Sequence, residues 1–125
     1  MRVGIARANV IRSDGERGSG TVMAVALGLV VMICMAAALM LAQAAAMAQR
    51  AATAADLAAL AGADAARVLT AGDPCVVASE TAARHGASLS DCAVSGGEIV
   101  DVRTQLARGT VFGTATARSR AGPPP

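Results

Sequence analysis

The 125-residue sequence lacks the aromatic side chains that usually dominate a small protein core. It has no tryptophan or tyrosine and one phenylalanine, Phe112, although 54 % of its residues are hydrophobic. Nearly half of this apolar content is alanine, concentrated in the first half of the chain. Because large side chains supply most of the burial energy of a compact core, the composition argues against a compact soluble enzyme. It favours a hydrophobic helix that carries a small folded head.

Lysine is also absent, and the arginines are unevenly spread. Residues 1–17 contain four arginines and two acidic residues, residues 18–49 carry no charge, and residues 50–125 are balanced. A nucleic-acid partner would require a basic stripe, usually with aromatic side chains that stack on bases. The sequence has neither feature, so we expect no nucleic-acid partner.

Motifs of catalysis and cofactor binding are missing as well. The sequence contains no CxxC, no HExxH, no glycine-rich phosphate loop and no Ser/His/Asp set of suggestive spacing. Its one histidine, His85, has no second ligand at zinc-site spacing. We therefore expect no enzymatic activity, no cofactor or metal, and no small-molecule substrate.

Residues 22–42 form an apolar run of 21 residues whose one exception is Cys34. About 20 such residues span a hydrocarbon core roughly 30 Å thick, so the run predicts a membrane helix. Four arginines precede it and only Arg50 follows closely, which places residues 1–20 in the cytoplasm and the C-terminal part outside. The main alternative is a signal peptide that is cut at a small-x-small site, after residue 44 or 46. A further alternative is a buried helix of a soluble protein.

The membrane helix is expected to continue beyond the bilayer, so that residues 21–70 form one element ending near Leu69. Gly20, Ala24 and Gly28 recur on one face of it, a pattern that permits close helix packing in lipid, although small residues are frequent throughout this chain. Farther along, Leu57, Leu60, Ala61 and Val68 share one side with Asp64 among them. If that side is covered, Asp64 requires a partner such as Arg67 or Arg84; otherwise it faces water.

Residues 71–122 are expected to form the head, and residues 123–125 a proline tail. Asp73 and Pro74 resemble an N-cap and first helical position, which predicts a helix over 75–85 that Gly86 ends. Strands are expected over 89–94, 99–107 and 111–118, with a hairpin turn at 95–98. The predicted fold class is therefore α+β: a long hydrophobic helix with a short helix on a three-stranded antiparallel meander.

A head this small usually needs a covalent or metal staple. Cys75 and Cys92 both lie outside the membrane in this topology, where disulfides persist. A bond between them would close an 18-residue loop and contribute roughly 3 kcal/mol in the chain-entropy model. The alternative is a pair of free, partly buried thiols.

Three stretches together resemble a known family. Residues 17–21 (RGSGT) lead into the apolar helix, residues 49–61 (QRAATAADLAALA) continue it, and Cys75 and Cys92 bracket a head that ends at residues 117–123 (ARSRAGP). In these features the chain resembles the TadE/TadG-like proteins of tight-adherence (Flp-type) pilus systems. It is most similar to the short TadE-like branch encoded beside helicase and secretion genes in high-GC Gram-positive bacteria.

The resemblance implies a membrane-inserted minor pilin-like protein that serves pilus assembly or secretion, with other pilin-like or assembly proteins as partners. It also implies candidate prepilin cleavage sites after Gly18 or Gly20. The family commonly has Glu at the fifth position after the cut, whereas this chain has Met23 or Val25. The rival hypothesis is a small secreted effector or binding protein, released by signal peptidase and stapled by a disulfide.

Overall fold

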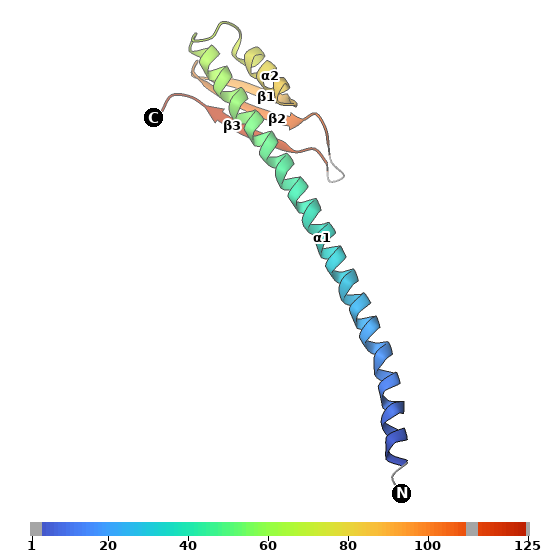
Figure 1. Ribbon diagram of the computed structural model, residues 1–125. Coiled ribbons are helices and arrows are strands. Elements are labelled where there is room, and N and C mark those ends of the chain that lie inside the picture. The colour runs from blue at the N-terminus through green and yellow to red at the C-terminus, as the bar shows by residue number, and fades with distance from the viewer. Residues whose placement is uncertain (1–3, 110–112, 125) are drawn as a thin grey trace. The chain divides into compact units, whose positions relative to one another are not determined.

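The computed structural model describes residues 4–109 and 113–124, with side chains from residue 18 onward. Over these ranges the chain forms helices α1 (Gly4–Ala66) and α2 (Pro74–Arg84) and strands β1 (Ala87–Ser95), β2 (Ile99–Leu106) and β3 (Thr116–Ala121) (Figure 1). The predicted α+β class is confirmed. The chain divides into two compact units, Met1–Leu41 and Ala42–Pro125.

Within the first unit, α1 has no tertiary cover among the described residues. Its large apolar side chains are all exposed, from Val22 at 70 % to Leu41 at 71 %. Among the described residues α1 is the one helix long and apolar enough to cross a membrane, judged by length and composition. A helix that is apolar on every side is expected in lipid or in a large core.

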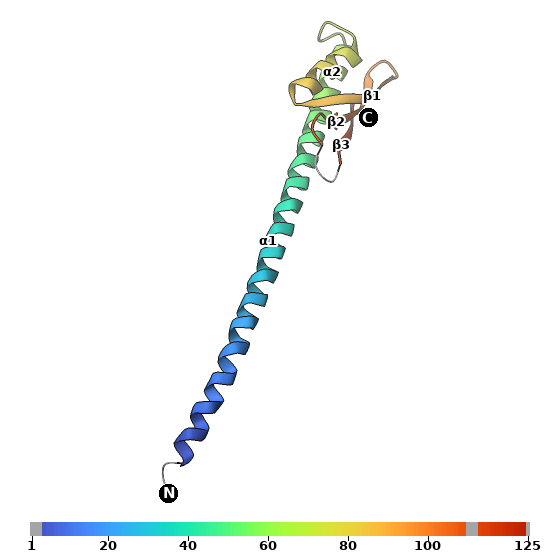
Figure 2. The ribbon, with the colours of Figure 1, turned by 90° about the vertical axis from the view of Figure 1, so that its right-hand side faces the viewer.

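The second unit begins at Ala42, so the last turns of α1 belong to the head rather than only carrying it. Both views show the end of α1 and α2 packed beside the sheet (Figures 1 and 2). The head was expected to start at residue 71, whereas the second compact unit includes α1 from Ala42 onward. The sequence does not indicate this contribution of α1, because alanine gives little amphipathic contrast along a helix.

The helix α1 ends at Ala66, three residues earlier than expected. The N–H of Leu69 donates to the carbonyl of Asp64 at 2.9 Å, and the N–H of Val68 donates to that of Ala65 at 3.0 Å. This pair of bonds is the Schellman pattern, whose C′ residue is left-handed. Here that residue is Val68 with φ of 62°, a conformation that usually requires glycine.

The start of α2 follows the predicted capping. The Asp73 carboxylate accepts hydrogen bonds from the backbone N–H groups of Cys75 at 3.0 Å and Val76 at 3.3 Å, with Pro74 in the first turn. His85 caps the other end, and Gly86 follows with φ of 72°. The helix is thus displaced from its predicted bounds by one residue.

The sheet has the order β1-β2-β3 and both pairs are antiparallel, as the predicted meander requires. Gly96 and Gly97 supply the positive φ values of the first turn. The third strand was expected over 111–118, of which 111 and 112 lie outside the described residues, but it runs over Thr116–Ala121. The prediction was wrong because alternation fixes which residues face inward, whereas pairing with β2 fixes where the strand lies.

The core of the head is built from alanine. Ten of the thirteen buried apolar side chains in the described residues are alanines, and Val100 and Val102 are the largest apolar side chains buried completely. On α1 the buried face comprises Ala51, Ala54, Ala55, Ala58, Ala59 and Ala63.

Over residues 51–63 the sheet and α2 cover the alanine-rich surface of the extended helix. Leu57 and Leu60 point the other way and are 37 % and 57 % exposed. Asp64, on the same side, is exposed and needs no buried partner.

Two contacts fix α1 on the sheet. The Thr104 hydroxyl, fully buried, donates to the Ala51 carbonyl at 3.1 Å. At Gly62 an added Cβ would lie 3.0 Å from Val100 Cγ1 and 3.1 Å from the Pro74 carbonyl oxygen. Glycine at this position therefore permits the close approach of α1 to β2 and to the start of α2.

Candidate functional site

The covalent staple of the head joins Cys75 to Cys92, as the sequence predicts. Their Cα atoms lie 6.0 Å apart, inside the normal range for a disulfide. The bond links the first turn of α2 to β1 across 17 positions of sequence. Cys34 is a free thiol and is exposed on α1.

A bulge in β1 places Cys92 on the inner face of the sheet. Leu89 pairs with Thr104 and Cys92 pairs with Val102, while the register shifts between Leu89 and Asp91. Three positions separate Leu89 from Cys92, so a regular strand would turn them to opposite faces. The extra residue, Ser90, lets both point toward α2. Sequence alternation gave no signal for this bulge.

The small-residue face of α1 is open. An added Cβ at Gly20 or Gly28 would meet nothing within 4 Å, and Ala24 on the same face is exposed. Another helix therefore has room to approach this face. Gly18 and Gly20, the candidate cleavage positions, lie inside α1, so a peptidase would have to unwind the helix there.

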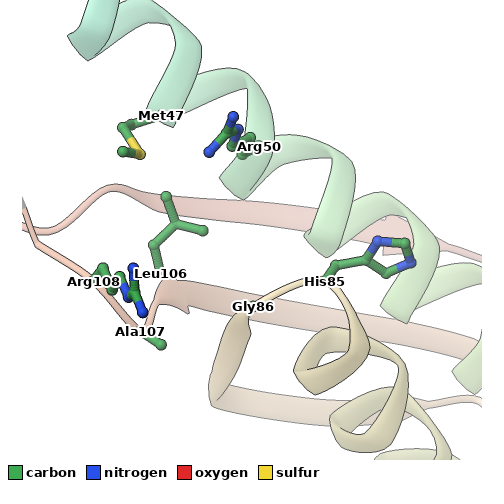
Figure 3. Close-up of a pocket in the computed structure, with 7 residues that line it drawn as sticks. All are labelled: Met47, Arg50, His85, Gly86, Leu106, Ala107 and Arg108. Carbon is green, nitrogen blue, oxygen red and sulfur yellow. The ribbon is translucent and has the colours of Figure 1, made fainter.

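A basic hollow of about 230 Å³ lies in the head and was not anticipated (Figure 3). We call it the Arg50 hollow. Its lining residues come from α1, from the two residues after α2, and from the end of β2 with the loop that follows it: Met47, Arg50, His85, Gly86, Leu106, Ala107 and Arg108. A second hollow adjoins it through Arg50 and His85. The one signal in the sequence was Arg50, the first charge after the apolar run.

The outer face of the sheet carries an ion pair. Arg118 donates two hydrogen bonds to the Asp101 carboxylate, at 2.9 and 2.7 Å. These bonds, reinforced by the charges of Arg118, Arg120 and Arg103, lower the pKa of Asp101 below its usual value, although desolvation acts in the opposite direction. The same bonds raise the pKa of Arg118.

In the part of the chain that the structure describes, no three His, Cys, Asp or Glu side chains are grouped as a metal site would require. His85 is exposed at the end of α2. No family model matches the chain, and no curated protein or solved structure matches it.

Proposed function

We propose that the protein is a single-pass membrane component of a Flp-type pilus or secretion apparatus, similar to TadE-like minor pilins, with its head outside the cytoplasm. The observation that carries this proposal is the continuity of α1, which runs without a break from the apolar segment into the core of the head. Because one helix contains both the apolar segment and part of the core of the head, a membrane that binds the apolar segment also anchors the head.

The exposed apolar surface of α1 supports the membrane part of the proposal. Between Gly18 and Leu41 every residue is exposed, and this surface is mostly aliphatic. Contiguous apolar surface of this extent is not stable in water and marks a membrane or protein contact. The disulfide supports an extracytoplasmic head, because the cytoplasm keeps thiols reduced. The resemblance to TadE-like proteins supports the assembly role.

One observation favours the rival, a secreted protein. The compact unit of the head begins at Ala42, close to the candidate signal-peptidase sites after residues 44 and 46. A cut at either site would leave the buried face from Ala51 onward intact. The released head would therefore keep its core and its disulfide.

The mature N-terminus and the cell fraction distinguish the two functions. The proposed function predicts a chain in the membrane fraction that resists alkaline extraction and begins at Met1, Ser19 or Thr21. Secretion predicts a soluble chain that begins at residue 45 or 47.

A matched pair of variants sharpens this test. Ala44→Leu blocks both signal-peptidase sites. Ala44 is the residue directly before the cut after residue 44, and it is the third residue before the cut after residue 46. Ala45→Leu is the control with the same added volume on an exposed helix position. If Ala44→Leu alone converts a soluble product into a membrane-bound one, the secreted function holds.

Orientation is tested by reporters that are active only outside the cytoplasm. A fusion after Arg120 should be active and a fusion before Arg17 inactive, because the arginines before the span favour the cytoplasm. The reverse pattern would contradict the proposed topology.

Assembly is tested at the small-residue face. Gly28→Leu should leave insertion intact, since leucine is favoured in the span, but should weaken co-purification with a neighbouring pilin-like helix. Val31→Leu is the control. If in-membrane crosslinking finds the same neighbours for wild type and Gly28→Leu, this face is not the contact.

A further inference from the structure

We propose that the Arg50 hollow binds the phosphate of an anionic phospholipid headgroup, such as that of phosphatidylglycerol, at the outer surface of the membrane. The inference rests on the membrane anchoring in the proposed function and adds a ligand class to it. Its support comes from the charge, the rigidity and the position of the hollow.

The charge of the hollow has one sign. Arg50 and Arg108 line it, with His85 at the boundary to the adjoining hollow (Figure 3). No acidic side chain lines either hollow, and within residues 18–109 and 113–124 the structure gives neither arginine an ion pair. Two guanidinium groups without a protein anion favour a phosphate, whose oxygens match the arginine fork.

The walls of the hollow are held in place before any ligand arrives. The N–H of Ala107 donates to the Gly86 carbonyl at 3.0 Å, which ties the segment of Arg108 to the end of α2. The N–H of Leu106 donates to the Ala115 carbonyl at 3.0 Å. Arg50 stands on α1, which Thr104 anchors to the sheet. A site assembled from fixed elements loses less entropy when it binds.

The position along α1 favours a lipid over a soluble phosphate. Arg50 follows Ala42, the last residue of the apolar run, by eight residues, which is about 12 Å of helix. The headgroup layer is roughly 5–8 Å thick on each side of the hydrocarbon core. Arginine side chains reach back toward such a layer with their charged ends. The Arg50 backbone therefore lies roughly 4–7 Å beyond this layer, and its long side chain can reach back to the phosphates.

The hollow also has an apolar side, which suits a lipid. Met47 is half-buried and Leu106 is buried, and both line the same space as the arginines. A headgroup presents a charged phosphate next to a less polar glycerol backbone. The combination of guanidinium groups and aliphatic side chains fits that chemistry better than it fits a free ion.

The test is a native mass spectrometry titration of the detergent-solubilised full chain with phosphatidylglycerol and, separately, with phosphatidylcholine. Wild type should bind phosphatidylglycerol more tightly. Arg50→Gln/Arg108→Gln should lower that affinity about thirtyfold, roughly fivefold for each arginine. Arg67→Gln/Arg84→Gln removes the same charge from exposed positions outside the hollow and should change the affinity less than twofold.

A lysine variant distinguishes specific binding in the hollow from non-specific electrostatic attraction between the protein and the lipid. Arg50→Lys/Arg108→Lys keeps the charge but loses the forked donors, so it should bind phosphatidylglycerol more weakly than wild type. Equal binding would overturn the inference, and so would equal affinity for the two lipids. Inorganic phosphate that binds as tightly as the lipid would identify a soluble anion and also overturn it.

Alkaline extraction of cell membranes keeps the two proposals apart. A chain that stays in the membrane but shows no preference for phosphatidylglycerol refutes the lipid site alone. A soluble chain beginning at residue 45 or 47 refutes the proposed function, and the lipid site with it.

Discussion

Replacing Gly62 with alanine tests how closely α1 packs on the head. The added methyl would lie 3.0 Å from Val100 Cγ1, 3.1 Å from the Pro74 carbonyl oxygen and 3.3 Å from Ala78 Cβ. The carbonyl belongs to the backbone and the Ala78 methyl has no rotamer to change. Two of the three neighbours can therefore yield only if α1 moves away from α2.

Two opposing effects set the magnitude. In an open helix alanine is more favourable than glycine by about 1 kcal/mol. Overpacking a tight core costs about 1–3 kcal/mol, and rigid neighbours favour the upper part of that range. We therefore expect Gly62→Ala to lower the free energy of unfolding of the head by about 1–2 kcal/mol, despite the better helix former.

The assay is pulse proteolysis across a urea series with the full chain in detergent micelles and its disulfide intact. Ala61→Gly, at the half-exposed neighbouring position, is the control for helix propensity and should lower stability by about 1 kcal/mol. If Gly62→Ala instead raises stability by about 1 kcal/mol, α1 does not approach β2 and α2 as closely as described.

Three further predictions use the same assay. Val68→Gly should raise stability by about 1 kcal/mol, because a left-handed valine costs about 1–2 kcal/mol and this one is 87 % exposed; a decrease would contradict the helix end described. The Asp101–Arg118 pair lowers the pKa of Asp101, so its contribution is full above the unfolded pKa of about 3.9 and is lost as pH falls through the lower folded pKa. Asp101→Asn should remove this loss of stability at low pH. If the dependence of stability on pH is the same in wild type and Asp101→Asn, the predicted contribution of the ion pair is refuted. Reduction of the Cys75–Cys92 bond should cost about 3 kcal/mol, and finding both thiols alkylatable without reductant in protein from its native host would contradict the bond.

Features that depend on a few neighbouring residues were predictable from the sequence. Asp73 and Pro74 begin a helix because a carboxylate satisfies free N–H groups and proline needs no donor there. Gly96 and Gly97 make a hairpin because they accept positive φ. The strand β2 was placed within one residue because its apolar and polar residues alternate clearly.

Features that depend on distant partners were not predictable in this way. Leucine outweighs alanine on any hydropathy scale, so Leu57 and Leu60 marked the apparent apolar side of α1. The sheet selects the opposite side because alanine lets the helix backbone approach, as the hydrogen bond from Thr104 to the Ala51 carbonyl requires. The Arg50 hollow also depends on distant partners, because its residues come from three separate parts of the chain. The sequence alone therefore did not predict it.

The alanine face and the glycine face of α1 have different consequences for assembly. Over residues 51–63 the small side chains on one face are buried in the core of the head, because Val100 and Val102 pack against them. On the outer side of α1, by contrast, Leu57 and Leu60 remain exposed. Along residues 18–41 the small residues remain open, and close helix packing through them depends on another chain. One composition thus serves intramolecular packing in the head and leaves the apolar segment free for lipid or a neighbouring helix.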